Sequence, residues 1–303
     1  MAFMTNENKL ERKNSFNIVG TLKDAKIRGG VNAKNGQEYV SVNAVIESVI
    51  GGKTNEYEVE YFANKLTKDG KESQLFVNYS KMPDMIGKKI STSGELRENM
   101  FWSTKTNQIS SSQRLSGRFV RLATDNTPDA GTFELGGFIA RSISEKKNKN
   151  DEVYRYDVVI GQSNYKGDNL DRFTLSIRPE DRPILAGVEG YEIGSTVELK
   201  GQLEFTTETI VKEDTNTAFG EGITKTFTNK SHNFFITGGS NPIDDESAYD
   251  QATIKKLADA YNAKTAAKEL EAKNKVGNAS ASTTKEAPTA VNAPISKRQA
   301  SLI

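Results

Sequence analysis

The segment RENMFWSTKTNQ (97–108) combines aromatic and cationic side chains. It places Phe101 and Trp102, the only tryptophan of the chain, between Arg97 and Lys105. Aromatic faces stack on planar rings and cationic side chains bind phosphates, which together is typical of a surface that holds single-stranded nucleic acid. Neighbouring residues of a strand point to opposite faces, so one ring can instead close the end of a hydrophobic core. In both interpretations we expect the segment to form a strand hairpin.

Arginines recur on several other segments with strand character. The segment RLSGRFVRL (114–122) carries Arg114, Arg118 and Arg121. In the second half of the chain, Arg155 lies in VYRYDVVI (153–160), and Arg172 and Arg178 are the first and last residues of RFTLSIR (172–178). We interpret these arginines as candidate phosphate contacts, although a solvated strand face would carry the same residues. Tyr154, Tyr156 and Phe173 are expected in the core.

Catalytic and metal-binding chemistry is poorly represented in the sequence. The chain has no cysteine, and His232 is its only histidine, so neither a thiolate metal site nor a histidine pair can form. Glycine-rich phosphate-binding motifs do not occur either. Asp244, Asp245 and Glu246 are better explained as the beginning of a helix than as a metal site. We therefore predict that the protein is not an enzyme and has no catalytic residues, metal or cofactor.

These candidate residues lie on two units with matching patterns. GELRENMFW (94–102) and GQLEFTTET (201–209) both contain Gly-x-Leu, 107 residues apart. FNIVGTLKDAKI (16–27) corresponds to FELGGFIARSI (133–143), and EYVSVNAVI (38–46) to VYRYDVVI. Apolar and polar residues alternate in these segments, as in strands with one buried face. In each unit a non-alternating connection follows the third strand.

Five strands with a connection after the third are typical of the OB-fold, although other five-stranded barrels give a similar pattern. We predict a mainly all-β chain with two tandem OB-fold Greek-key barrels. The predicted division is a flexible arm at 1–13, OB domains at 14–123 and 131–240, an amphipathic helix at 241–273 and a disordered tail at 274–303. The glycines Gly94 and Gly201 are expected to permit close strand approach or a bend, and Leu96 and Leu203 to fill the two cores.

The first unit resembles the bacterial and phage single-stranded-DNA-binding protein family. The resemblance is carried by IVGTLKDAKI, NGQEYVSVNAVIES, EVEYFANKL and IGKKISTSGELRENMF. It implies stacking roles for Phe62, beside Lys65, and for Phe101, and it is diffuse in the second unit. A duplicated pair of such domains looks most like a phage or plasmid replication protein. The basic ending SKRQASLI differs from the acidic, partner-recruiting tail of that family.

Charge is divided unevenly between the two units. Residues 1–122 hold 19 Lys and Arg against 13 Asp and Glu, and residues 123–240 hold 13 against 19, which gives +6 and −6. This favours the first unit as the electrostatic contact. However, Glu56, Glu58 and Glu60 are expected on the outer face of its third strand. They could pair with lysines on an adjacent strand, divert the nucleic acid to the 97–108 hairpin, or contact a subunit or partner.

We therefore predict sequence-independent binding and protection of single-stranded DNA during phage or plasmid replication or recombination, by base stacking and phosphate contacts. Replication or recombination proteins are candidate partners. The alternatives are an accessory factor that uses OB barrels as protein-binding scaffolds, and RNA binding. Apolar runs long enough to span a membrane are absent, and the expected location is the cytoplasm. The sequence leaves open whether the protein is a monomer or a dimer.

Overall fold

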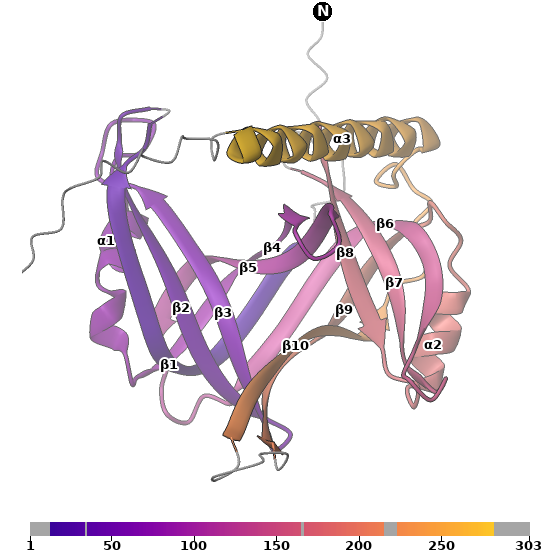
Figure 1. Ribbon diagram of the computed structural model, residues 1–303, viewed down its shortest axis with the longest axis horizontal. Coiled ribbons are helices and arrows are strands. Elements are labelled where there is room, and N and C mark those ends of the chain that lie inside the picture. The colour runs from indigo at the N-terminus through magenta and orange to yellow at the C-terminus, as the bar shows by residue number, and fades with distance from the viewer. Residues whose placement is uncertain (1–12, 34, 165–166, 215–222, 282–303) are drawn as a thin grey trace, which may run out of the picture.

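Ten strands and a long terminal helix dominate the computed structural model, which describes residues 13–33, 35–164, 167–214 and 223–281 (Figure 1). The first half contains β1 (Asn14–Val31), β2 (Glu38–Ile50), β3 (Lys53–Asn64), α1 (Gln74–Ser80), η1 (Met82–Met85), β4 (Lys89–Ser103) and β5 (Gln108–Leu122). The second half contains β6 (Ala130–Lys147), β7 (Val153–Ser163), β8 (Leu170–Ile177), α2 (Arg182–Glu189), β9 (Thr196–Asp214), β10 (Ile223–Gly239) and α3 (Gln251–Ala281).

The strands form two barrels with the same connections. In the first, β1 pairs with β2 and β4, β2 with β3, β3 in parallel with β5, and β4 with β5. In the second, β6 pairs with β7 and β9, β7 with β8, β8 in parallel with β10, and β9 with β10. A short helix follows the third strand of each barrel. This is the OB-fold topology, so the predicted fold class is confirmed.

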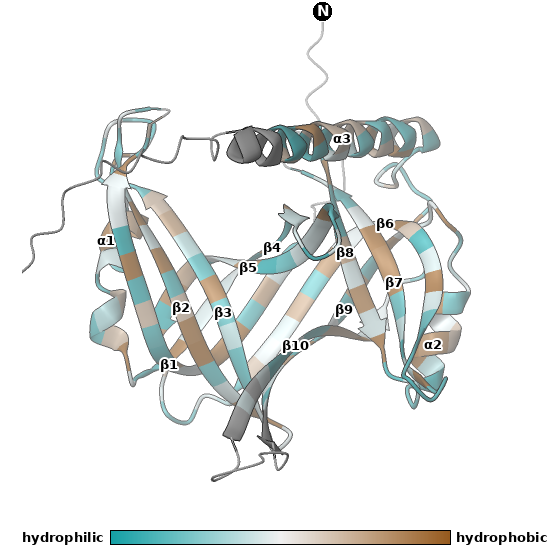
Figure 2. Ribbon diagram, in the orientation of Figure 1, coloured by the Kyte–Doolittle hydropathy of each residue, from teal (hydrophilic) through white to brown (hydrophobic). Residues whose placement is uncertain are grey.

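Alternating burial along the strands builds the barrel cores. In β3, Tyr57, Val59 and Tyr61 are buried while Glu58 and Glu60 are exposed. Figure 2 shows the same alternation of hydrophobic and hydrophilic residues along β2. Tyr156 and Phe173 pack with the core as expected, but Tyr154 is 52% exposed, so its assignment to the core was wrong. The chain reverses close to Tyr154, where a tight turn at 148–152 joins β6 to β7.

The repeated Gly-x-Leu element has the same role in both barrels. A Cβ atom on Gly94 would lie 2.0 Å from the Ser116 carbonyl oxygen, and one on Gly201 would lie 2.0 Å from the Phe235 carbonyl oxygen. Real Cβ atoms do not come so close to backbone oxygens, so only glycine fits at either position. The leucine two residues later is buried in each core, with 1% and 2% of its surface exposed. The predicted roles of glycine and leucine are confirmed.

The two barrels are joined by antiparallel pairing of β1 with β6. The register sets Phe16 opposite Phe133, and these two residues also occupy matching positions opposite Gly94 and Gly201. The pairing therefore relates the two barrels by an approximate two-fold axis near Phe16 and Phe133. One ten-stranded sheet results. The division into separate domains at 14–123 and 131–240 stays a prediction.

Each barrel also extends a hairpin onto the other. From β9–β10, the Leu203 carbonyl accepts a hydrogen bond from the Tyr57 hydroxyl (2.9 Å), and the Phe205 amide donates to the Asn55 side chain (3.0 Å). From β4–β5, the Gln113 side chain exchanges two hydrogen bonds with the backbone of Thr174. This reciprocal exchange fixes the outward faces of β1–β3 and β6–β8 relative to each other.

The terminal helix begins later and ends later than the predicted range of 241–273. Ile243 forms a bridge with Thr196, which holds the preceding segment extended along the second barrel. Asp250 then caps the helix, because its carboxylate accepts hydrogen bonds from the amide and hydroxyl of Thr253. The carboxylates at 244–246 therefore do not begin the helix. Most of the predicted arm (1–12) and tail (282–303) lies outside the described residues, while 274–281 belong to α3.

Helix α3 packs on both barrels. Leu257 is buried against Phe138 and Leu170. Further along, the Tyr261 hydroxyl donates to Glu98 (2.8 Å), which lies on β4 of the first barrel. Among the helices that the structure describes, none combines the length and apolar character that a membrane span requires.

Candidate nucleic-acid interface

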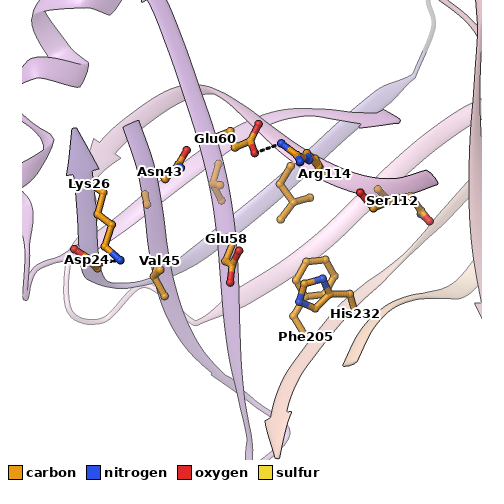
Figure 3. A pocket seen from close by; sticks show the side chains of 14 residues that line it. Asp24, Lys26, Asn43, Val45, Glu58, Glu60, Ser112, Arg114, Phe205 and His232 are labelled. Carbon is orange, nitrogen blue, oxygen red and sulfur yellow. Dashed lines mark hydrogen bonds and ion pairs between the residues drawn. The ribbon is translucent and has the colours of Figure 1, made fainter. Parts of the chain in front are cut away.

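A pocket of about 410 Å³ lies between the outward face of the first barrel and the β9–β10 hairpin of the second (Figure 3). Strands β1, β2 and β3 supply one wall because their side chains alternate, and every second residue points out of the barrel. Phe205 and His232 supply the opposite wall, with ring centroids 4.4 Å apart and planes 10° from parallel. Its charged lining is Asp24, Lys26, Glu58, Glu60 and Arg114.

The three glutamates of β3 are engaged within the chain. Glu58 binds Lys230 of β10 (2.5 Å), Glu60 binds Arg114 of β5, and Glu56 accepts a hydrogen bond from Thr207 of β9 (2.8 Å). The hydrogen bond from Lys230 lowers the pKa of Glu58, which is therefore ionised at neutral pH. Of the three interpretations, ion pairing accounts for Glu58 and Glu60, although Lys230 comes from the second barrel.

His232 is positioned by the hairpin rather than by a catalytic partner. It stacks on the ring of Phe205 with its other side exposed, and desolvation of the covered side lowers its pKa, so the imidazole is neutral at pH 7. Phe205 is itself only 3% exposed and contacts Tyr57 and Phe234. The aromatic wall is thus part of the contact between the barrels.

A second pocket, of about 370 Å³, lies on the outward face of the second barrel. It adjoins the first because Ser112 and Gln113 line both. Four cationic side chains and one carboxylate line it, which gives a balance of +3: Arg141, Lys146, Arg155, Arg172 and Asp157. The cationic pocket therefore lies on the unit whose overall charge is −6, and the net charge of a unit did not predict its location.

Asp157 organises the cationic pocket from below. Its side chain is 5% exposed and accepts a hydrogen bond from Ser176 (2.9 Å). Arg155 binds it at 3.0 Å, and Lys146 lies 3.9 Å away. Arg172 lies with its guanidinium 4.0 Å from the centroid of the Tyr261 ring, and its buried Nε has no hydrogen-bond partner. One buried carboxylate thus contacts two of the four cations, which leaves a surplus of positive charge in the pocket.

An aromatic pair lies further along the outward face of the first barrel. Phe62 is 54% exposed and stacks on Tyr39, with ring centroids 5.4 Å apart and planes at 28°. Arg28 lies on the same face, because the strand register aligns it with Ser41 and Phe62. Lys65 is close in sequence and pairs with Glu38 (2.8 Å). Two partly exposed rings beside cations can stack on unpaired bases.

The predicted site residues are divided among several places. Arg114 lines the first pocket, Arg155 and Arg172 line the second, and Phe62 and Lys65 lie by the aromatic pair. Arg178 lies elsewhere, in a third pocket, over the ring of Phe235 and paired with Glu204.

Phe101, Trp102 and Lys105 of the 97–108 hairpin line neither of the two adjoining pockets. Lys105 lies in the exposed turn of the hairpin. Phe101 is 44% exposed, while Trp102, on the opposite face, is half-buried. Arg97 and Arg118 both pair with Glu95, and Arg121 is exposed near the end of β5.

Sequence reasoning missed Tyr39, Arg28, Arg141 and Lys146. Tyr39 and Arg28 could have been found, because extending the outward register of Phe62 across two neighbouring strands reaches them. Arg141 and Lys146 were obscured by irregular pairing, since the register between β6 and β7 shifts three times in this region. Alternation alone cannot assign a face across such shifts.

Comparisons with known proteins give a family and a fold likeness. The structure of the wild-type single-stranded DNA binding protein from Thermus aquaticus is similar to this one, with 10% sequence identity and a TM-score of 0.47. The match covers 80% of this chain and 99% of the Thermus aquaticus chain. A deletion mutant of that protein is 12% identical, covering 78% of this chain and 98% of its own, with a TM-score of 0.46. No curated protein sequence matches significantly. The YorF family model matches residues 13–274, and the chain belongs to the YorF family.

Proposed function

We propose that the protein binds single-stranded DNA, largely independently of sequence, in the cleft formed by the two adjoining pockets and the Tyr39–Phe62 pair. The observation that carries the proposal is the cationic pocket, which is lined by four cations and a single buried carboxylate. A surplus of cations in a concave site attracts a polyanion. Binding of a strand there releases counterions, which makes affinity depend on salt.

The aromatic pair supports a single strand over a duplex. Stacking on Tyr39 or Phe62 requires a base with an open face, which an unpaired strand supplies and an intact duplex does not. Because stacking does not read hydrogen-bonding edges, it tolerates any base. Phosphate contacts on the second barrel and base stacking on the first together account for sequence-independent binding.

Protein scaffolding is the weaker proposal. It was supported mainly by the acidic outward face of β3 in the first barrel, to which a partner protein could bind. Glu56, Glu58 and Glu60 instead contact β5, β9 and β10 of the same chain. The two barrels thus occupy each other's surface at this point, which argues against an external protein partner on this strand face; the acidic second unit is the other feature that favours scaffolding.

The test is a salt titration of binding to labelled oligo-dT, with charge reversal in the cationic pocket. Arg141→Glu is the informative variant, because Arg141 is exposed and lines the pocket. Lys81→Glu is the matched control, since it makes the same charge change at the exposed end of α1. If all four cations neutralise phosphates, log Kd should change with log salt with a slope of about 3 in magnitude.

We expect Arg141→Glu to weaken binding and reduce this slope, and Lys81→Glu to leave both close to the parent. The proposal fails if oligo-dT does not bind, or if the two variants weaken binding equally.

A further inference from the structure

The first pocket is lined by more carboxylates than cations. Lys26 lies 3.4 Å from Asp24, and Arg114 binds Glu60. The partner of Glu58, Lys230, does not line the pocket. Three carboxylates and two cations line the pocket, and Lys230 outside the lining compensates the charge of Glu58 without filling all of its acceptor positions. A carboxylate has about four lone-pair positions, so its ion pair leaves it able to accept further hydrogen bonds.

The neighbouring pocket has the opposite character. Its balance is +3, and it meets the first pocket at Ser112 and Gln113. Phosphates of a strand lying in the cleft are attracted to the surplus of cations on the second barrel, whereas the cations beside the first pocket are already paired with Asp24, Glu58 and Glu60. The cleft therefore orients the strand, with its backbone towards the second barrel and bases towards the first.

We infer that the pocket between β3 and the β9–β10 hairpin is a base pocket that prefers bases with an exocyclic amino group, with Glu58 as the acceptor. This inference rests on the proposed function. The volume of about 410 Å³ lies within the range of pockets that enclose small organic ligands, so a single base fits. Asn43, which also lines the pocket, offers an additional amide acceptor.

The chemistry of the base edges supplies the discrimination. Cytosine and adenine present amino groups, and Glu and Asp accept hydrogen bonds from the cytosine amino group. Thymine and uracil present a carbonyl oxygen at the corresponding position, which a carboxylate repels. A mixed sequence can shift its register to place a suitable base in this one pocket. The preference is therefore compatible with binding that is otherwise independent of sequence.

The test compares oligo-dC with oligo-dU of equal length, which both lack the thymine methyl group and differ only at N3 and position 4 of the base edge. Anisotropy is measured at mildly alkaline pH, where cytosine is unprotonated. We expect oligo-dC to bind about tenfold more tightly, as one well-placed hydrogen-bonded contact to a base edge would give. Glu58→Gln should bring the ratio of the two affinities close to one, because the amide both donates and accepts.

Glu56→Gln is the matched control. It makes the same change on the same strand face, near the same Lys230, but Glu56 does not line the pocket. It should keep the parental ratio. Equal binding of both oligonucleotides by the parent, tighter binding of oligo-dU, or equal effects of the two variants on the ratio would overturn the inference and leave the proposed function standing. If neither oligonucleotide binds, the proposed function fails and the base pocket with it.

Discussion

Removing the Phe62 ring should weaken DNA binding while leaving the fold intact. Phe62 is 54% exposed, so Phe62→Ala removes only about half of the burial of a phenylalanine, which is worth about 1 kcal/mol of stability. Loss of a stacked base is worth about 1–3 kcal/mol of binding, or roughly a 5- to 150-fold rise in Kd. The effect on binding should therefore equal or exceed the effect on stability.

The assay is fluorescence anisotropy with labelled oligo-dT, together with thermal melts of each variant. Phe119→Ala is the matched control, because Phe119 is 63% exposed on β5 but lines neither adjoining pocket. It should bind like the parent. The reasoning is refuted if Phe62→Ala retains parental affinity, or if Phe119→Ala loses as much affinity as Phe62→Ala.

Two further predictions concern stability. Gly94→Ala and Gly201→Ala should each lower the free energy of unfolding by about 1–3 kcal/mol, because both new methyl groups meet backbone oxygens at 2.0 Å. Urea denaturation measures this loss. The control is Gly187→Ala, which should not destabilise the protein because a Cβ atom there has no neighbouring atom within 4 Å. Burial keeps the pKa of His232 below its ordinary value, so below about pH 6.5 the unfolded chain binds a proton that the folded chain does not. Stability should fall as pH decreases from about 7 to 5.5, and a His232→Gln variant with the same pH dependence would contradict this assignment.

Local patterns predicted the strands and both cores because these depend on neighbours within one unit. Alternation in 38–46 and 56–62 was enough to assign buried faces, and the Gly-x-Leu repeat located matching strands in both barrels. The candidate site was predicted less well. Arg155 and Arg172, predicted as candidate phosphate contacts, both line the second pocket. The shape of the cleft, however, depends on how the β9–β10 hairpin meets β3, and no short-range pattern encodes that contact.

The same limit explains the acidic residues of the first barrel. In the sequence, Glu58 looks like an obstacle to a polyanion, because its partner Lys230 is 172 residues away. The ion pair depends on the contact between the β9–β10 hairpin and the first barrel, which local sequence does not encode. Charge summed over each unit was equally misleading, since the cations of the second pocket are concentrated on one face of a unit that is acidic elsewhere.

The pairing of β1 with β6 suggests what duplication within one chain makes possible. In a symmetric dimer of identical barrels, the same surface patch appears on both sides of an isologous interface. Two copies in one chain keep that geometry, with Phe16 opposite Phe133, but their outward faces can differ in sequence. Here one face carries Glu58 and Glu60 while the other carries a surplus of cations. A cleft with two unlike walls can orient a single strand, which a cleft with two identical walls cannot do.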